Sequence, residues 1–262
     1  MKEMARSWIV SLALIAPLFG LAPAVAQEKL PDPVRIGIEG AYPPFNFVDT
    51  NGKVQGFDVD IMNAICAAEK IRCEFVVQDW DGIIPGLQVG KYDVIIGLGI
   101  TEERKKAVDF TDKYWATENR FVGRKGKEWD YTPEGLKDVV IGLQGGAWQE
   151  AYVKAELPQS VMRSYQTLEQ AYLDMEAGRV DLVFSDTILL FHFLDSDRGK
   201  DYEFKGPVYD DPRYFGPGVG MGIRKGENLL RDTISDGIRK VRASGEYKKI
   251  NDKYFPFDIY GE

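Results

Sequence analysis

Two short segments far apart in the chain share one pattern, and this repetition constrains the fold more than any other sequence feature. Residues 90–96 and 178–184 each begin with Gly and a basic residue, pass through Asp and continue as an apolar strand. The β-branched strand at 34–38 is echoed in the same way at 139–143. Because amphipathic helical segments separate these strands, the pattern is typical of parallel βαβ units. We therefore predict an α/β protein of two similar lobes, each an open, mostly parallel sheet flanked by helices.

The order of the repeats also predicts how the chain is divided between the lobes. We assign residues 27–117 and 219–262 to a discontinuous lobe 1, and residues 118–218 to lobe 2. Two connecting strands, near 116–120 and 214–219, are expected to form the hinge. Open α/β sheets bind ligands at the carboxyl ends of their strands, so two such sheets predict a closing cleft between them. Within lobe 1, Asp58 is expected to cap a helix.

The first 26 residues have the composition of a secretory signal peptide. Lys2 and Arg6 provide a basic start, residues 8–21 are almost continuously apolar, and residues 24–26 form a small-x-small cleavage site. The alternative is a membrane anchor, but an apolar run of about 14 residues is shorter than the roughly 20 that span a bilayer. We predict cleavage after Ala26 and export of residues 27–262.

Export bears directly on the two cysteines of the chain, Cys66 and Cys73. In an oxidising compartment their short spacing favours a local disulfide, which we expect to contribute about 2.5 kcal/mol by constraining the unfolded chain. Two buried thiols are the alternative if the chain stays in a reducing compartment.

Composition excludes several classes of function. Lys and Arg number 33 against 41 Asp and Glu, which gives a formal net charge of −8, whereas nucleic-acid binding needs a basic surface. One His and two Cys cannot supply a common four-ligand zinc site, and a lone His weakens any Ser-His-Asp or Cys-His arrangement. We therefore expect no metal, no cofactor and no catalytic residues, and we predict that the protein is not an enzyme.

Several local motifs in a fixed order carry a resemblance to a known family; they lie at residues 42–45, 56–61, 81–85, 101–104 and 144–146. With these motifs the chain resembles the periplasmic solute-binding proteins, family 3, of amino-acid ABC transporters, most of all the lysine/arginine/ornithine-, histidine- and opine-binding branch. The resemblance implies the type II periplasmic binding protein fold with a two-strand hinge. It also implies delivery of an amino acid to an inner-membrane permease that a cytoplasmic ATPase drives, and we expect a monomer.

The resemblance assigns three charged residues to the ligand. Arg104, at a helix start, would bind the α-carboxylate with its guanidinium; a solvated Arg paired with Glu102 or Glu103 is the alternative. Asp186 follows a strand at its carboxyl end and would bind the α-ammonium group, with a helix N-cap as an alternative or additional role. Glu39 follows the first strand and would bind a cationic ligand side chain, unless it is a solvated loop acid.

Two aromatic residues and several glycines complete the expected site. Tyr42 and Trp80 would stack on the aliphatic stem or the guanidinium of the ligand, although ordinary packing in the core or at the cleft rim explains such residues equally well. Backbone groups of Gly97, Gly99 and Gly146 are expected to hydrogen-bond the ligand.

Two positions depart from the family pattern. The family usually has hydroxyl residues where this chain has Gly99 and Ala147, and Trp148 would fill space where smaller residues are usual. Without those hydroxyls, and with Arg104 retained, the site suits a substituted α-amino group, as in opines. Asp186 argues instead for a free ammonium group, so both ligand classes stay open.

The sequence thus predicts a receptor that captures a polar, cationic amino acid, namely arginine, lysine, ornithine or histidine, by closing its cleft. An opine or another N-substituted amino acid is the alternative ligand. A sensor-linked binding protein would use the same architecture. So would a cyclohexadienyl dehydratase-like enzyme, for which the sequence offers no paired general acid and base.

Overall fold

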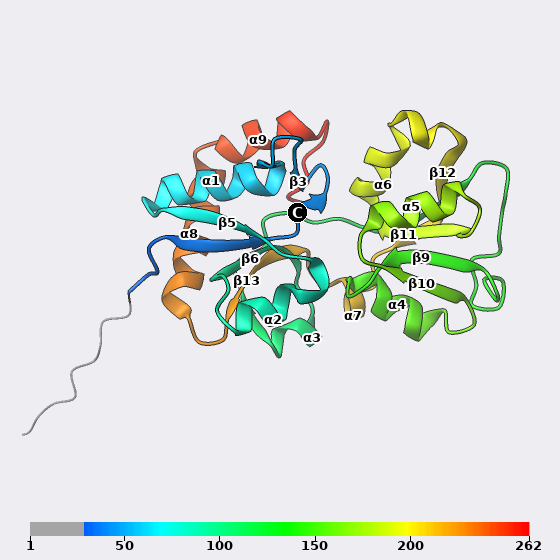
Figure 1. Ribbon diagram of the computed structural model, residues 1–262, viewed down its shortest axis with the longest axis horizontal. Helices are drawn as coiled ribbons and strands as arrows, with labels where there is room; N and C mark the ends of the chain where they lie inside the picture. The colour runs from blue at the N-terminus through cyan, green and yellow to red at the C-terminus, as the bar shows by residue number, and fades with distance from the viewer. Residues whose placement is uncertain (1–28, 262) are drawn as a thin grey trace, which may run out of the picture.

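Two five-stranded sheets, one in each half of the molecule, form the framework of the fold (Figure 1). The computed structural model describes residues 29–261, so the predicted signal peptide and its cleavage site lie outside the described residues. Lobe 1 is built on the first sheet, which has the strand order β5–β1–β6–β13–β7. Its strands are β1 (Val34–Ile38), β5 (Cys73–Val77), β6 (Val94–Gly99), β7 (Val108–Phe110) and β13 (Val219–Arg224).

Lobe 2 is built on the second sheet, which has the strand order β10–β9–β11–β8–β12. Its strands are β8 (Asn119–Arg124), β9 (Val140–Gln144), β10 (Val161–Tyr165), β11 (Leu182–Asp186) and β12 (Tyr202–Tyr209). Corresponding strands occupy the same places: β1 and β9 are second in order, and β6 and β11 are central. These are the strands that echo one another in sequence, so the predicted two-lobed α/β architecture is confirmed.

Each sheet is mixed rather than mostly parallel. In lobe 1, β1 pairs in parallel with β5 and β6, whereas β13 is antiparallel to β6 and β7. In lobe 2, β9 is parallel to β10 and β11, whereas β8 is antiparallel to β11 and β12. The antiparallel strands β13 and β8 each enter their sheet at the carboxyl end of a neighbouring strand. Val219 of β13 lies opposite Gly99 at the end of β6, and Asn119 of β8 lies opposite Asp186 at the end of β11. A strand that enters at the carboxyl end of its neighbour runs back along it.

Helices cover both faces of each sheet and bury its apolar strands (Figure 1). In lobe 1, three helices pack on one another on one face: α1 (Phe57–Glu69), α8 (Asn228–Ala243) and α9 (Glu246–Tyr254). The other face carries α2 (Ile83–Gln88), which follows the 3₁₀ turn η1 (Trp80–Gly82), and α3 (Glu102–Lys105). A small sheet of β2 (Ala41–Tyr42), β3 (Asn46–Val48) and β4 (Val54–Gln55) adjoins α1.

Lobe 2 has the same layered arrangement. One face carries α5 (Leu168–Glu176) and α6 (Thr187–Leu194), and the other carries α4 (Trp148–Glu156) (Figure 1). The 3₁₀ turn η2 (Asp197–Asp201) follows α6, and the short α7 (Pro212–Phe215) packs on α4. No helix within residues 29–261 is both long and apolar enough to cross a membrane.

The start of α1 differs from the expectation. Gly56 is the N-cap residue, whereas Asp58 lies in the first turn and is fully buried. Asp58 accepts hydrogen bonds from Asn46 Nδ2 (2.8 Å) and from the hydroxyl of Tyr114 (2.6 Å). Burial raises the pKa of Asp58 to about 6, against the effect of these two hydrogen bonds. Its partners come from the small sheet and from the connection after β7, so Asp58 joins three segments beneath the floor of the cleft.

The predicted disulfide is present. Cys66 and Cys73 are bonded, with their Cα atoms 6.3 Å apart. The bond links α1 to the first residue of β5. It therefore closes the turn between a helix and an edge strand and contributes nothing to the cleft.

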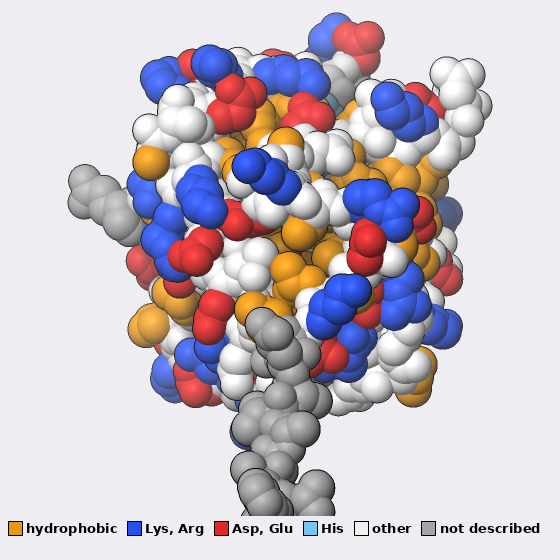
Figure 2. All heavy atoms as spheres, turned by 90° about the vertical axis from the view of Figure 1, so that its left-hand side faces the viewer, with side chains coloured by type: hydrophobic (Ala, Val, Ile, Leu, Met, Phe, Trp, Pro, Cys, Tyr) orange, Lys and Arg blue, Asp and Glu red, His pale blue; other side chains and the backbone are white. Residues whose placement is uncertain are grey.

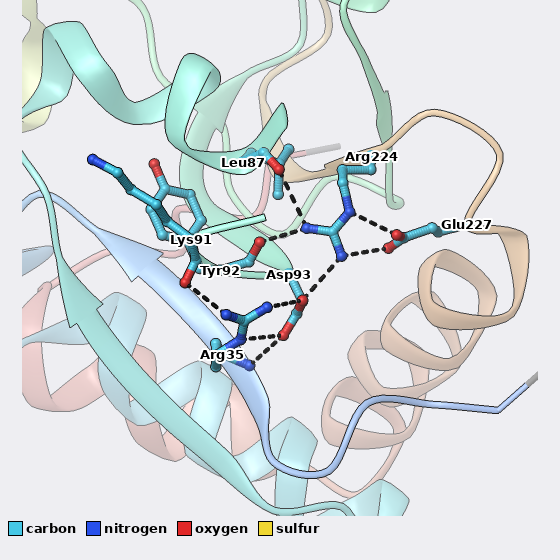
Figure 3. Close-up of polar contacts among 7 residues, drawn as sticks. All are labelled: Arg35, Leu87, Lys91, Tyr92, Asp93, Arg224 and Glu227. Atoms are coloured by element: carbon cyan, nitrogen blue, oxygen red, sulfur yellow. Dashed lines mark hydrogen bonds and ion pairs between the residues drawn. The ribbon is translucent and has the colours of Figure 1, made fainter. Parts of the chain in front are cut away.

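A cluster of charges occupies the amino end of β6 (Figure 3). The buried carboxylate of Asp93 accepts hydrogen bonds from Arg35 Nη2 (2.8 Å) and Nε (3.0 Å) and from Arg224 Nη2 (2.9 Å). Arg224 also pairs with Glu227 (2.6 Å). Burial pushes the pKa of Asp93 upwards, but the two guanidinium groups outweigh it and hold that pKa below its usual value. The cluster ties β1, β6 and β13 together at the edge of the sheet remote from the other lobe.

Two connections join the lobes, one between β7 and β8 and one between α7 and β13. They touch at Trp115 and Val219, which form an antiparallel bridge. The backbone N–H of Ala116 donates to the carbonyl of Ile259 (2.7 Å), so the C-terminal segment lies against the first connection.

Figure 2 shows the outer end of lobe 1, where acidic and basic side chains are interspersed. The lobe boundaries at 117/118 and 218/219 stay a prediction.

Candidate functional site

A cleft lies between the two sheets, at the carboxyl ends of β1, β6, β9 and β11. It encloses about 450 Å³ of empty space, its opening included. Lobe 1 and lobe 2 both contribute side chains to it. The lining residues are Glu39, Tyr42, Asn46, Trp80, Ile96, Gly97, Gly99, Arg104, Trp115, Gln144, Ala147, Trp148, Gln149, Asp186 and Val219.

The structure brings the predicted binding residues together. All of them line the cleft except Gly146, whose carbonyl oxygen accepts a hydrogen bond from Arg104 Nη2 (2.9 Å) at its edge. Gly97 has a positive φ of 80°, and a side chain there would approach the carboxylate of Asp58. Ala147 is the N-cap residue of α4 and offers no side-chain hydrogen bond. The contacts of these residues with a ligand stay a prediction.

Arg104 extends from the short helix α3 into the cleft. Thr101 caps this helix and accepts a hydrogen bond from the backbone N–H of Arg104 (3.2 Å). The guanidinium donates to two backbone carbonyls, that of Gly99 (3.0 Å) in lobe 1 and that of Gly146 in lobe 2. It also lies 5.5 Å from the centre of the Trp80 ring. Burial lowers the pKa of Arg104 to about 10, against the pull of nearby negative charge.

The alternative interpretation of Arg104 is wrong. Glu102 and Glu103 pair with Lys105 and Lys106, one turn further along the chain. Among the described residues, the guanidinium of Arg104 has no carboxylate within ion-pair distance, so its charge is met only by neutral carbonyl groups.

Asp186 faces Arg104 from the end of β11. It holds the N-cap position of α6, but its side chain makes no capping hydrogen bond. Instead the carboxylate, which is 3 % exposed, accepts hydrogen bonds from the Tyr42 hydroxyl (2.6 Å), Trp148 Nε1 (3.1 Å) and Gln149 Nε2 (3.1 Å). Burial raises the pKa of Asp186 to about 6, although these bonds and the charge of Arg104 act in the opposite direction. A helix cap is therefore not what fixes this side chain.

Glu39 lines the cleft directly after the end of β1 and is 8 % exposed. Its Oε1 accepts a hydrogen bond from Gln144 Nε2 (2.6 Å), which also donates to the carbonyl of Gln166 (3.1 Å). Among the described residues, neither Oε2 of Glu39 nor Oε1 of Gln144 has a donor. Burial raises the pKa of Glu39 to about 7, with the charge of Asp79 adding to this effect and the Gln144 bond opposing it. Glu39 is thus not a solvated loop acid.

Sequence reasoning missed three polar residues of the cleft: Asn46, Gln144 and Gln149. Gln144 ends β9 just as Asp186 ends β11, so the position of Gln144 at a strand end was a usable signal. Asn46 and Gln149 carry no such signal, because their roles depend on partners that are distant in sequence. Asn46 supports the turn after Glu39 by accepting from the N–H of Gly40 (2.9 Å).

Hydrogen bonds cross the cleft between the lobes. Tyr42 of lobe 1 donates to Asp186 of lobe 2, and Gln144 of lobe 2 donates to Glu39 of lobe 1. At the rim, Gln166 Nε2 donates to the carboxylate of Asp79 (2.9 Å). These contacts hold the lobes in a closed arrangement in which the charged groups of both lobes face one enclosed space.

Two mixed sheets joined by two connections, with a charged cleft at their strand ends, define a type II periplasmic binding protein. The model of the bacterial extracellular solute-binding proteins, family 3, matches residues 34–257. The chain belongs to this family.

Named relatives cover the whole chain. It is 42 % identical to the L-arginine-binding protein of Pseudomonas aeruginosa, over 100 % of this chain and 99 % of the relative. It is 37 % identical to the histidine-binding periplasmic protein of Escherichia coli, over 98 % of this chain and 99 % of the relative. A solved structure of a Salmonella typhimurium periplasmic binding protein with high arginine specificity is similar, with a TM-score of 0.80 and 30 % identity over 86 % of this chain and 100 % of that one. These relatives are named as binding proteins rather than enzymes.

Proposed function

We propose that this protein is the periplasmic binding component of an amino-acid ABC transporter and that its ligand is a cationic L-amino acid, arginine before lysine, ornithine or histidine. One observation carries the proposal. Two buried carboxylates and one guanidinium face the same cleft, and each is met by neutral groups rather than by an opposite charge. Charges that are desolvated without a partner are costly, so they favour a ligand that brings the complementary charges.

The arrangement matches the charges of arginine group by group. The α-carboxylate would bind the guanidinium of Arg104 in place of the carbonyl of Gly146. The α-ammonium would bind Asp186, and the side-chain guanidinium would bind the unused oxygens of Glu39 and Gln144. Trp80 would stack along the ligand, as it already does beside Arg104.

The same contacts supply the mechanism of capture. Arg104 and Glu39 belong to lobe 1, whereas Asp186 and Gln144 belong to lobe 2, so only the closed form offers all four to one ligand. A ligand that binds the closed form better than the open form shifts the equilibrium between them. The closed protein would then dock on an inner-membrane permease that a cytoplasmic ATPase drives. We further propose a monomer, cleavage after Ala26 and no catalytic activity.

Calorimetry with residues 27–262 tests the proposal. L-Arginine should bind with a micromolar or lower Kd, whereas citrulline, its neutral isostere, should bind about 100-fold more weakly because it leaves Glu39 unpaired. Glu39→Gln should reduce that ratio to about 10 or less. Asp109→Asn is the matched control, since Asp109 pairs with Lys225 outside the cleft. The proposal is wrong if no cationic amino acid binds more tightly than about 1 mM.

A further inference from the structure

The indole of Trp148 reaches across the cleft to Gly99. Trp148 is the first residue of α4 in lobe 2, and Gly99 is the last residue of β6 in lobe 1. A Cβ atom at position 99 would lie 2.4 Å and 2.6 Å from two carbons of this indole, and 3.0 Å from Nη1 of Arg104. No side chain fits at position 99 while the indole is there. The absence of a side chain at position 99 therefore leaves no free space in the cleft, because the indole fills it.

The indole is held in place on two sides. Its Nε1 donates to Oδ1 of Asp186 (3.1 Å), and its ring packs edge-on against Phe215, with the centroids 5.9 Å apart. Phe215 is buried in α7, just before the second connection between the lobes. Trp148 itself is only 6 % exposed. The ring is thus a fixed wall that borders both the Arg104 side and the Asp186 side of the cleft.

Asp186 is enclosed as well. Trp148 and Gln149 both donate to its Oδ1, and Tyr42 donates to its Oδ2. These three side chains surround the carboxylate and donate to both of its oxygens, so a carbon substituent on a nitrogen that approaches it would meet them. Among the described residues that line the cleft, Arg104 is the one Lys or Arg. A second ligand carboxylate near Asp186 would therefore find no cation.

We infer that Trp148 is a specificity-determining residue that restricts the cleft to amino acids with an unsubstituted α-ammonium group and excludes N-substituted amino acids, opines included. The inference rests on the proposed function, because it places the α-carboxylate at Arg104 and the α-ammonium at Asp186. Both groups are bonded to one carbon, so that carbon and any substituent on the nitrogen lie against the indole. Opines add to the nitrogen a carbon branch that ends in a second carboxylate, and the cleft opposes both additions.

Three ligands separate the effect of size from that of charge. L-Arginine is the reference, an N2-alkyl-L-arginine adds only bulk, and octopine adds bulk together with a second carboxylate. By calorimetry, octopine should bind the unaltered protein at least about 100-fold more weakly than arginine, and the N2-alkyl compound at least about 10-fold more weakly. Binding of either compound within about threefold of arginine would overturn the inference while leaving the proposed function intact. Failure of arginine itself to bind would overturn the proposed function.

Variants at position 148 test the residue. Trp148→Ala should bring the N2-alkyl compound to within about threefold of arginine, whereas octopine should recover less because its second carboxylate still lacks a cation. Trp148→Phe is the matched control, since it keeps a ring but loses the Nε1 bond to Asp186. It should keep the discrimination and weaken arginine binding by about 3- to 10-fold. Unchanged discrimination in folded Trp148→Ala, judged by circular dichroism, would overturn the inference.

A double-mutant cycle tests the contact with Gly99 directly. Gly99→Ala should weaken arginine binding at least about 10-fold in the unaltered protein, because the new methyl group collides with the indole when the lobes close. In the Trp148→Ala background the same substitution should change the Kd by no more than about twofold. If Gly99→Ala weakens arginine binding equally in the two backgrounds, the indole does not occupy this space and the inference is wrong.

Discussion

A cluster of charged side chains lies at each end of strand β6, and the two clusters differ in whether the partners of these side chains are charged or neutral. At the amino end, Asp93 is enclosed by Arg35 and Arg224, so full charges meet and cancel (Figure 3). At the carboxyl end, Arg104 and Asp186 face the cleft, and both are satisfied by neutral partners. The same strand therefore separates a structural cluster from a cluster that is complete only when a ligand joins it.

The direction of the pKa changes distinguishes the two clusters. The pKa of Asp93 is held low because two guanidinium groups overcome its burial. The pKa of Asp186 is raised to about 6 because burial prevails over neutral donors and a guanidinium that does not pair with it. Buried charge thus stabilises the fold at one edge of the sheet, whereas at the other edge it has no ion-pair partner among the described residues and can bind a charged ligand. Perturbed carboxylates in a cleft are typical of functional sites.

The largest effect is expected from removing the cleft cation. Arg104→Met should weaken arginine binding by about 1000-fold, or roughly 4 kcal/mol, because a buried ligand carboxylate would lose its only cation. Chemical denaturation should show an unchanged or higher free energy of unfolding, since the substitution removes a desolvated charge that has no ion-pair partner. A large loss of stability would mean that Arg104 stabilises the fold as Asp93 does, and the proposed difference between the two clusters would be wrong.

Asp93→Asn should have the opposite pattern. Loss of the carboxylate leaves Arg35 without a charged partner among the described residues and Arg224 with Glu227 alone, and we expect the free energy of unfolding to fall by about 2–3 kcal/mol. The Kd for arginine should stay within about twofold, because the cluster lies at the far end of β6 from the ligand. Urea denaturation and calorimetry on the same preparation measure both quantities. If binding falls in step with stability, the two ends of β6 are not independent.

A smaller effect is expected from pH in the ligand-free protein. Glu39 has a pKa of about 7 in the fold, and Asp58 and Asp186 have values of about 6, all above those of an unfolded chain. The folded protein therefore retains protons that the unfolded chain releases between about pH 4 and 7, so stability should fall as pH rises through that window. We expect the decrease to be seen as a lower Tm at pH 7.5 than at pH 5.5.

Ligand and substitution both refine this test. Arginine supplies positive charge in place of the protons, so its affinity should rise from about pH 5.5 to 7.5. Glu39→Gln should reduce the pH dependence of both Tm and affinity. Asp93, whose pKa is lowered, should have the opposite effect on the pH dependence of stability. Its effect is confined to acid pH, where the protein loses stability as pH falls. A Tm that rises from pH 5.5 to 7.5 in the ligand-free protein would contradict the assignment of raised pKa values to the cleft.

Much of the fold was predictable because it is local. The echoed strands at 34–38 and 139–143 occupy equivalent places in the two sheets. The direction of β13 and β8 was not predictable, because strand periodicity is the same in either direction and only the path between the lobes decides it. Asp58 was misassigned as a cap for a similar reason, since its partners Asn46 and Tyr114 are distant in sequence.

The charged residues of the site were easier to find than the neutral ones. Glu39 and Asp186 follow strands at the edge where open sheets bind ligands, and that position alone made them candidates. Gln149 acts through its hydrogen bonds to Asp186 and Asn119, which form only once α4 has packed on the sheet, and nothing local indicates these contacts. The approach of Trp148 to Gly99 joins two lobes, so it depends on how those lobes close.

The tryptophans of the cleft have a practical consequence. Of the five in the chain, Trp80, Trp115 and Trp148 line the ligand space, each in a different setting: beside a guanidinium, at the bridge between the two connections, and bonded to a carboxylate. Indole emission responds to such surroundings, so the protein carries its own optical reporter. Titration of its intrinsic fluorescence would follow occupancy and closure without a label, and Trp148→Phe would reveal how much of the signal arises at the wall of the cleft.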